Sequence, residues 1–295
     1  MSILNYKPSA LARSLRRQET LTIGVLLPQL NQPFFSTLAF AIEKTLFASN
    51  YKTLICSSEE DINKEAAYID MLLRQRVDGV LIVPTGHSSE NINRLINGRV
   101  PAVLVDRDIP GIHINRVLSN NSDGGCQGIC HLLELGHRNI GIIGGPSYSQ
   151  AIEQRMSGIK QGYKELGLAY VEVNTLLSTL TEFEIGYQMA HQLLHRDQRP
   201  TAIFALTDVI AVGVMHAAAE HQLNLPHDLS VVGFDDIPMA RFSIPALTTV
   251  AQPIYNMGAT AANLLLEQLQ SDQPDMRTIT LPTELIVRSS TAPFG

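Results

Sequence analysis

The sequence lacks tryptophan altogether and has only three cysteines among its 295 residues. Cys126 and Cys130 stand four residues apart, which is a helical spacing and not the C-x-x-C of a redox or metal motif, and Cys56 stands alone. We therefore expect no disulfide framework and interpret the thiols as buried structural groups. Apolar runs are short, and none reaches the roughly 18 residues of a membrane span. The first residues lack the charged-then-apolar order of a signal peptide, so we expect a cytoplasmic protein with no membrane partner.

Apolar residues make up 45% of the chain and charged residues 17%, which is the balance of an ordinary globular protein. The length of 295 residues exceeds one typical domain. It fits two halves of an α/β fold that share a cleft, and such a chain can bury a substantial core.

Positive charge is concentrated at the N-terminus. Residues 1–20 contain Lys7, Arg13, Arg16 and Arg17 against Glu19, so they carry +3 and the other 275 residues carry −9 of the net −6. The larger part is thus a poor binder of polyanions, and only the basic start suits contact with phosphates. On charge alone, a solvated helix face is the commoner explanation of such a run, and nucleic-acid contact is the alternative.

From Thr22 onward, short apolar runs alternate with longer amphipathic ones, which predicts β-α-β units and parallel sheet. The strands are expected at 22–27, 52–56, 79–83, 101–105, 139–144, 170–173, 201–206 and 229–234. The helices are expected near 34–49, 62–75, 121–135, 151–166, 181–195, 208–221 and 254–270. The pause at 108–120 is the expected crossover between the two halves.

In open parallel sheets, ligands bind beyond the carboxyl ends of the strands, where helix N-termini and loop amides converge. The corresponding loops are expected at 28–35, 84–88, 106–109, 145–155, 207–209 and 235–239.

Enzyme motifs are incomplete throughout the chain. HQLLH at 191–195 has the two-histidine spacing of a zinc protease, but residue 192 is Gln where that chemistry requires a carboxylate base. We interpret His191 and His195 as residues on the polar face of a helix. GIIGG at 141–145 lacks the order of a dinucleotide or P-loop motif, and no G-x-S-x-G elbow occurs. Asp235 and Asp236 are adjacent and point different ways, so we expect no catalytic residues, no metal and no cofactor.

Several well separated stretches together resemble the LacI/GalR (lac repressor) family of bacterial transcription regulators over nearly the whole chain. They are, in order, NYKPSALARSL, IGVLLPQLNQPFF, VDGVLIVP, VPAVLVDR, LGHRNIGIIGGP, RPTAIFALTD, DLSVVGFDDIPMARFSIPALTTVAQP and TELIVRSST. Each stretch alone is weak evidence, but their order and spacing identify the family.

This resemblance implies a role for the basic start. The segment from Pro8 to Leu15, with Ala12 in its ARSL, is similar to the family's hinge helix, which enters the minor groove of the operator. Leu15 stands where the family places its intercalating side chain, and Arg13 and Arg16 would approach phosphates. In the alternative interpretation, Leu15 is a linker leucine and the arginines are solvated.

The family's helix-turn-helix is about 45 residues that precede the hinge, and the sequence does not contain it. Without these residues, most contacts with phosphates and bases are missing. We therefore expect operator DNA as a partner only when a helix-turn-helix is supplied. The chain is interpreted as the effector-binding and dimerisation part of a repressor.

The resemblance implies the fold of periplasmic sugar-binding proteins, an α/β architecture of two doubly wound parallel-sheet subdomains joined by three crossovers. Residues 1–20 would form the hinge and linker. One subdomain would comprise 21–119 plus 253–280, and the other 120–252 plus 281–295.

Two charged residues match the family's effector cleft. Arg155 aligns with its arginine and Asp235 with its aspartate, and a guanidinium and a carboxylate together suit adjacent sugar hydroxyls. An ordinary helix-surface arginine and a helix N-cap are the alternatives for these two positions. Ser149 stands where some relatives have a second arginine for a ligand carboxylate, which disfavours a purine-like anionic effector. Asp106 and Arg107 lie on a loop at the cleft, where an internal ion pair is an equal alternative.

The remaining cleft residues are polar or aromatic. Phe34 and Phe35 match the family's NPFF position, and we expect Phe34 to face the cleft and stack on a sugar ring. Asn31 beside it is a candidate hydrogen-bonding group. Thr207 replaces the asparagine usual in AND, and Gln252 is a candidate ligand at a crossover.

We therefore predict a homodimer or tetramer that senses a small sugar, a sugar phosphate or another sugar derivative and controls operator binding allosterically. The alternative is a periplasmic sugar-binding protein of a transporter, and an α/β enzyme is a third interpretation.

Overall fold

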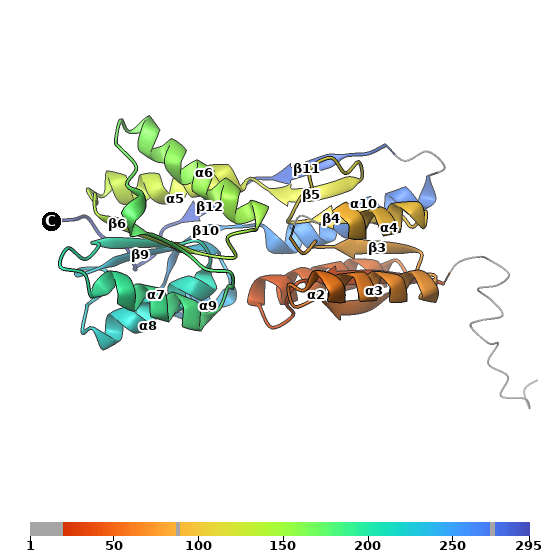
Figure 1. The fold of residues 1–295 in the computed structure, drawn as a ribbon, viewed down its shortest axis with the longest axis horizontal. Coiled ribbons are helices and arrows are strands. Elements are labelled where there is room, and N and C mark those ends of the chain that lie inside the picture. Colours follow the sequence, from red (N-terminus) through yellow and green to blue (C-terminus); the bar gives the residue numbers. More distant parts are fainter. Residues whose placement is uncertain (1–19, 87–88, 272–274) are drawn as a thin grey trace, which may run out of the picture.

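The computed structural model describes residues 20–86, 89–271 and 275–295. The hinge residues predicted to contact DNA, Pro8, Ala12, Arg13, Leu15 and Arg16, lie outside these ranges. The described chain forms two lobes side by side along the longest axis of the molecule, each a sheet between helices (Figure 1). None of the helices in these ranges has the length and apolar character to cross a membrane.

The first lobe is built on a parallel sheet of six strands in the order β11-β5-β4-β3-β1-β2. Its strands are β1 (Thr22–Leu27), β2 (Lys52–Ser57), β3 (Gly79–Ile82), β4 (Ala102–Val105), β5 (Asn115–Ser119) and β11 (Thr278–Leu281). Its helices are α2 (Pro33–Ala48), α3 (Ile62–Gln75), α4 (Ser89–Asn97) and α10 (Ile254–Gln270). Helices α2 and α10 pack together on one face of the sheet, and α3 and α4 on the other.

The second lobe repeats this plan with the order β12-β10-β9-β8-β6-β7, in which only β12 is antiparallel to its neighbour. Its strands are β6 (Ile140–Gly144), β7 (Thr175–Leu177), β8 (Ala202–Ala205), β9 (Ser230–Asp235), β10 (Thr248–Ala251) and β12 (Glu284–Ile286). Its helices are α5 (Asn121–Glu134), α6 (Gln150–Glu165), η1 (Glu172–Asn174), α7 (Phe183–Leu194), α8 (Asp208–Glu220) and α9 (Pro238–Phe242). Helices α5 and α6 cover one face, and α7 and α8 the other.

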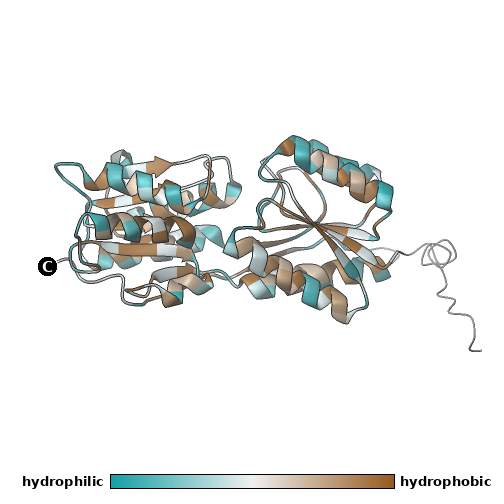
Figure 2. Cartoon of the chain, turned by 90° about the horizontal axis from the view of Figure 1, so that it is seen from below, coloured by the Kyte–Doolittle hydropathy of each residue, from teal (hydrophilic) through white to brown (hydrophobic). Residues whose placement is uncertain are grey.

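The central strands are apolar on both faces because helices cover both sides of each sheet. In β3, Val80 and Ile82 face the α3–α4 layer, whereas Leu81 faces the α2–α10 layer. Figure 2 shows the same distribution, with hydrophobic strands inside each lobe and hydrophilic residues on the outer sides of the helices. The two lobes therefore have separate cores.

The chain passes between the lobes three times: from β5 to α5, from β10 to α10, and from β11 to β12. The predicted doubly wound fold with three crossovers is thus confirmed. The strand expected at 170–173 is wrong: that segment leads into η1, and the strand beside β6 is β7, five residues later. The crossover expected within 108–120 follows β5, so most of that segment is loop and strand of the first lobe.

Candidate functional site

A cavity lies between the lobes where the strands of both sheets end. Its empty volume is about 540 Å³, part of which is open to solvent. The first lobe contributes Gln29, Gln32, Phe34, Phe35, Glu60, Asp106 and Arg107, and the second lobe and its crossover contribute Gly145, Pro146, Ser149, Ala151, Ile152, Arg155, Thr181, Thr207, Val209, Asp235 and Gln252. These residues lie at or after the carboxyl end of a strand or in the first two turns of the next helix. We call this space the interlobe cavity.

Arg155 projects from the second turn of α6 into the wall of this cavity and is 4% exposed. Its Nε donates to Asn121 Oδ1 at 2.8 Å, and its Nη1 donates to the carbonyl oxygen of Leu206. Its Nη2 lies 3.4 Å from Asp235 Oδ1, and the guanidinium carbon lies 3.7 Å from the ring centre of Phe234. These contacts fix the plane of the guanidinium group. The edge that carries Nη2 is paired with Asp235 and faces the cavity.

Asp235 ends β9 and is held from two sides. The Gln252 amide donates from Nε2 to Asp235 Oδ1 at 2.7 Å, and Arg155 pairs with the same oxygen. Burial raises the pKa of Asp235 to about 6, although the Arg155 guanidinium opposes this effect. Asp208 lies behind it, and burial also raises the pKa of that carboxyl, with a further contribution from Asp235. The second lobe thus places at the cavity a carboxylate whose ionised form is destabilised by burial.

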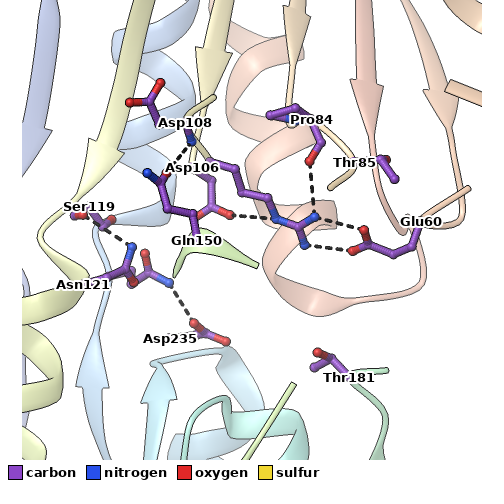
Figure 3. Close-up of polar contacts among 12 residues, drawn as sticks. Glu60, Pro84, Thr85, Asp106, Asp108, Ser119, Asn121, Gln150, Thr181 and Asp235 are labelled. Carbon is purple, nitrogen blue, oxygen red and sulfur yellow. Dashed lines mark hydrogen bonds and ion pairs between the residues drawn. The ribbon is translucent and has the colours of Figure 1, made fainter. Parts of the chain in front are cut away.

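Arg107 is the corresponding cation of the first lobe. Its two terminal nitrogens donate to the two oxygens of Glu60 at 2.8 and 3.0 Å, which is a bidentate pair, and Nη1 also donates to Pro84 O (Figure 3). The neighbouring Asp106 Oδ2 is 4.0 Å from Arg107 Nε. Burial raises the pKa of Asp106, and Arg107 partly offsets this. Both predicted alternatives for Asp106 and Arg107 therefore hold, because they line the cavity and also form an ion pair.

Three buried polar atoms around the cavity have no hydrogen-bond partner. They are Asp106 Oδ1, Arg107 Nε and Gln252 Oε1, and within the described residues the only other such atom is Ser119 Oγ. An unpaired polar group in a protein interior costs about 1 to 3 kcal/mol. The first lobe and a crossover strand thus present two acceptors and one donor that a polar ligand could satisfy.

The backbone is strained at the same place. Glu60, Asp106 and Asp235 have φ angles of 58°, 64° and 114°, in the left-handed region that L residues seldom adopt. Such strain costs roughly 1 to 3 kcal/mol a residue and tends to cluster at functional sites. The three carboxylates that line the cavity, Glu60, Asp106 and Asp235, are therefore all carried by residues with a strained backbone conformation.

Apolar groups cover the rest of the wall. Phe34 and Phe35 meet edge to face at 5.1 Å between ring centres, and both are 8% exposed. Ile152 and Val209 line the cavity from the opposite lobe. Phe34 lines the cavity as expected, and Phe35 lines it beside Phe34, while both rings also belong to the core of the first lobe.

Two hydrogen bonds join the lobes beside the cavity. The Asp108 backbone N–H donates to Gln150 Oε1 at 3.0 Å (Figure 3), and the Gln32 side-chain amide donates to the carbonyl oxygen of Thr181. Both bonds connect loops of different lobes, so they form only when the lobes approach one another.

Most of the predicted effector residues meet at this cavity. Phe34, Phe35, Ser149, Arg155, Thr207, Asp235 and Gln252 all line it. Ser149 and Thr207 precede the first turns of α6 and α8, and the Thr207 hydroxyl caps α8 by accepting from Ile210 N. Their part in binding an effector stays a prediction.

Asn31 is misplaced in the prediction. It is exposed and lies outside the lining, because the turn after β1 directs Gln32 inward and Asn31 toward solvent. Glu60 and Thr181 also line the cavity, although no sequence pattern predicted them. Glu60 follows an exposed edge strand and carries no motif, and only the pairing of its loop with Arg107 gives it a place in the wall.

The comparisons with known proteins agree with this geometry. Residues 129–291 match the model of the periplasmic binding protein-like domain family. The chain is 33% identical over 289 residues to the HTH-type transcriptional repressor PurR of Actinobacillus pleuropneumoniae, which covers 97% of this chain and 86% of that protein. It is 36% identical over 291 residues to the PurR repressor of Pectobacterium atrosepticum, at 98% and 85% coverage. A crystal structure of a LacI family transcriptional regulator from Enterococcus faecium with bound ribose superposes with a TM-score of 0.85, at 33% identity, and covers 93% of this chain and 100% of that chain.

Proposed function

We propose that this chain, which belongs to the LacI family of transcriptional regulators, binds a small neutral sugar in its interlobe cavity and thereby controls operator binding. The observation that carries the proposal is the set of unpaired buried atoms, Asp106 Oδ1, Arg107 Nε and Gln252 Oε1, at one cavity. A ring of hydroxyl groups can donate to the two oxygens and accept from the nitrogen.

The charges at the cavity favour a neutral ligand. Arg107 is paired with both oxygens of Glu60, and Arg155 is paired with Asp235. Each lining guanidinium among the described residues thus already has a carboxylate partner. A phosphate or a carboxylate on the ligand would have to compete for these cations next to several acidic side chains. The proposal therefore selects the neutral sugar among the predicted sugars and sugar phosphates.

The comparisons include a regulator with a bound sugar but do not choose the effector of this chain. The Enterococcus faecium regulator at 33% identity contains ribose, and the PurR repressors have similar identities, so identity alone does not choose an effector. Ser149 at the entrance of α6 supplies a hydroxyl where an anionic ligand would need a cation. The edge-to-face pair of Phe34 and Phe35 offers an apolar surface to one side of a sugar ring.

Regulation requires only that the ligand prefer one arrangement of the lobes. A differential affinity of about 1 to 3 kcal/mol between two states is typical of such coupling. In a homodimer acting in the cytoplasm, closure of the lobes would alter the spacing of the segments that precede residue 20. The family membership disfavours both an enzyme and the periplasmic receptor of a transporter.

Isothermal titration calorimetry tests this proposal. D-ribose, other neutral pentoses and hexoses, their phosphates and purine bases are titrated into the wild type, Arg155→Lys and Gln252→Ala. We expect one neutral sugar to bind, and each variant to weaken it at least tenfold, because both lose hydrogen bonds at the cavity. Thermal unfolding of the ligand-free variants verifies that they are folded.

Arg94→Ala, at a partly exposed position of α4 outside the cavity lining, is the control and should bind as the wild type does. Tight binding of phosphates or purines with no response to neutral sugars would refute the neutral-sugar proposal. If folded Arg155→Lys and Gln252→Ala bind the sugar as tightly as the wild type, the interlobe cavity is not the binding site.

A further inference from the structure

Three histidines meet on the surface of the second lobe, at the ends of α7 and α8 that lie away from the interlobe cavity. His191 is in the last turn of α7, His195 is the residue that ends it, and His221 is the residue that ends α8. One ligand nitrogen from each ring lies within 4.8 Å of the other two. His195 and His221 have ring centres 4.6 Å apart, and His191 and His221 4.7 Å.

Two of the three rings bond outward through one nitrogen, and the third bonds within the group. His191 Nε2 is 3.2 Å from Glu220 Oε2, so this nitrogen donates to the carboxylate and leaves Nδ1 without a proton. His195 Nδ1 is 2.7 Å from the carbonyl oxygen of His191, so Nδ1 carries the proton and Nε2 is unprotonated. His221 Nε2 donates to His191 Nδ1 at 2.8 Å, so a bound metal ion would replace this hydrogen bond.

His191 and His195 have the hydrogen-bond partners that are usual for metal-binding histidines. A ligating imidazole commonly donates its second N–H to a carboxylate or a backbone carbonyl, which fixes the tautomer and the ring orientation. Glu220 provides the first kind of partner to His191, and a main-chain carbonyl provides the second kind to His195. Tyr187 in turn donates from its hydroxyl to Glu220 at 2.8 Å and holds that carboxylate in place.

The fold also favours positive charge at this point. Both α7 and α8 begin at the interlobe cavity and end at the histidines, so two helix C-termini with their partial negative charge converge there. The two helices can lie this close because small residues face each other. A Cβ at Gly213 would come within 2.1 Å of the carbonyl oxygen of Phe183.

We propose that His191, His195 and His221 form a binding site for a divalent transition metal ion, of which Zn²⁺ is the expected occupant. Tetrahedral zinc bound at about 2.0 to 2.1 Å needs ligand nitrogens roughly 3.3 Å apart, which small rotations of these side chains supply. On binding, His221 carries its proton on Nδ1, and the fourth position is open to water. Three imidazoles without a thiolate suit zinc, copper or nickel and not calcium or magnesium.

The sequence alone indicated only half of this site. HQLLH supplies two ligands at helical spacing, and its glutamine excludes protease chemistry without excluding metal binding. The third ligand comes from the next helix, which only the packing of α7 against α8 brings near. The site is independent of the effector proposal, since its residues do not line the interlobe cavity.

A cobalt and zinc titration of untagged, full-length protein tests the site. Cys126, Cys130 and Glu165 form a second group that could hold a metal, so Cys126→Ser and Cys130→Ser are introduced into every protein compared. Co²⁺ should give visible bands of tetrahedral intensity at one equivalent. Saturating Zn²⁺ should displace it and raise the unfolding temperature by roughly 5 °C or more.

Single variants locate the ligands. His191→Ala, His195→Ala and His221→Ala should each weaken Co²⁺ and Zn²⁺ binding at least tenfold, and Glu220→Ala should weaken it by roughly tenfold through the orientation of His191. His113→Ala is the control: this exposed histidine lies in the first lobe, outside the three-histidine group. It should bind metal as the parent protein does.

Absence of the tetrahedral bands, or equal binding by the parent protein and all three histidine variants, would overturn the proposal. Equal weakening by His113→Ala would do the same, because it would indicate non-specific binding to surface imidazoles. Melting curves without metal verify folding. Should His191→Ala be unfolded, the exposed His195→Ala decides the outcome.

Discussion

Asp235 shows how a single buried carboxyl couples the cavity to pH. Its pKa is raised to about 6 by burial, so between about pH 4 and pH 6 the folded protein binds a proton that the unfolded chain releases. This contribution to stability is fully present below the unfolded pKa and is lost as the pH rises through the folded pKa. Stability at neutral pH is therefore reduced by the ionised form.

Asp235→Asn removes the titrating carboxyl, so the variant should lose less stability than the wild type as the pH rises. The free energy of unfolding of the variant, relative to the wild type, should increase between pH 4.5 and pH 7.5 by about 1 to 3 kcal/mol. Urea unfolding at the two pH values measures it. A relative stability that stays constant or decreases with pH would contradict the assigned cause.

At the same scale, residues attached to a recognisable motif could be located from the sequence, and the others could not. Arg155, in the helix after β6, and Asp235, the last residue of β9, have distinctive neighbours, and both reach the cavity. Asn31 and Gln32 are adjacent polar residues in one turn, and only the backbone decides which points inward. Glu60 acquires its place through Arg107, which is 47 residues away in the chain.

Among the elements, the α5–α6 pair determines where Arg155 stands. The two helices touch at Gly125, where a Cβ would come within 2.2 Å of the Arg155 carbonyl oxygen. A methyl group at Gly125 would collide with the main chain of α6, which cannot rotate away as a side chain can. The substitution must therefore displace one of the two helices.

Gly125→Ala should therefore destabilise the protein by about 1 to 3 kcal/mol and weaken sugar binding several-fold through the displaced guanidinium. Chemical unfolding and calorimetry measure the two effects. Ser157→Ala, at an exposed position of α6, is the control and should change stability by less than about 0.5 kcal/mol. Unchanged binding in a destabilised Gly125→Ala would show that Arg155 is positioned by other contacts.

Long periodic helices and strands with a continuous apolar run were predictable because their apolar residues form a recognisable pattern. The residue ranges expected for α3 and α10 equal those observed. Strands without such a run were not predicted. The edge strands β7, β11 and β12 are short and half exposed, and the interior strands β5 and β10 contain polar residues. Helix α4 escaped for a related reason, since its nine residues bury only a narrow stripe.

For the molecule as a whole, the bond between Asp108 N–H and Gln150 Oε1 is a contact of the closed lobes. Gln150→Ala removes it without touching the ion pairs of the cavity. If this bond contributes about 1 kcal/mol to closure, sugar affinity should drop roughly fivefold. Calorimetry gives the affinity, and small-angle scattering of the ligand-free variant should show a larger radius of gyration. If Gln150→Ala has the affinity and the radius of gyration of the wild type, other contacts hold the lobes closed.

A homodimer would bury an apolar patch on the second lobe. Phe242 is 77% and Ile244 96% exposed, beside Met239 at the start of α9. Ile244→Asp places a charge in this patch and should shift the mass measured by light scattering from dimer to monomer. Val171→Asp, at an exposed apolar position elsewhere on that lobe, is the control and should stay dimeric. A dimeric Ile244→Asp would place the interface elsewhere.

The last crossover has a consequence for biosynthesis. Strand β11 adds an edge to the sheet of the first lobe, and β12 adds an edge to the other sheet, and both fall within residues 278–286. Neither half can complete its hydrogen bonding while the ribosome is still adding these residues. The two halves of the molecule therefore complete their sheets together once these residues have been synthesised, although most of the first half is made long before.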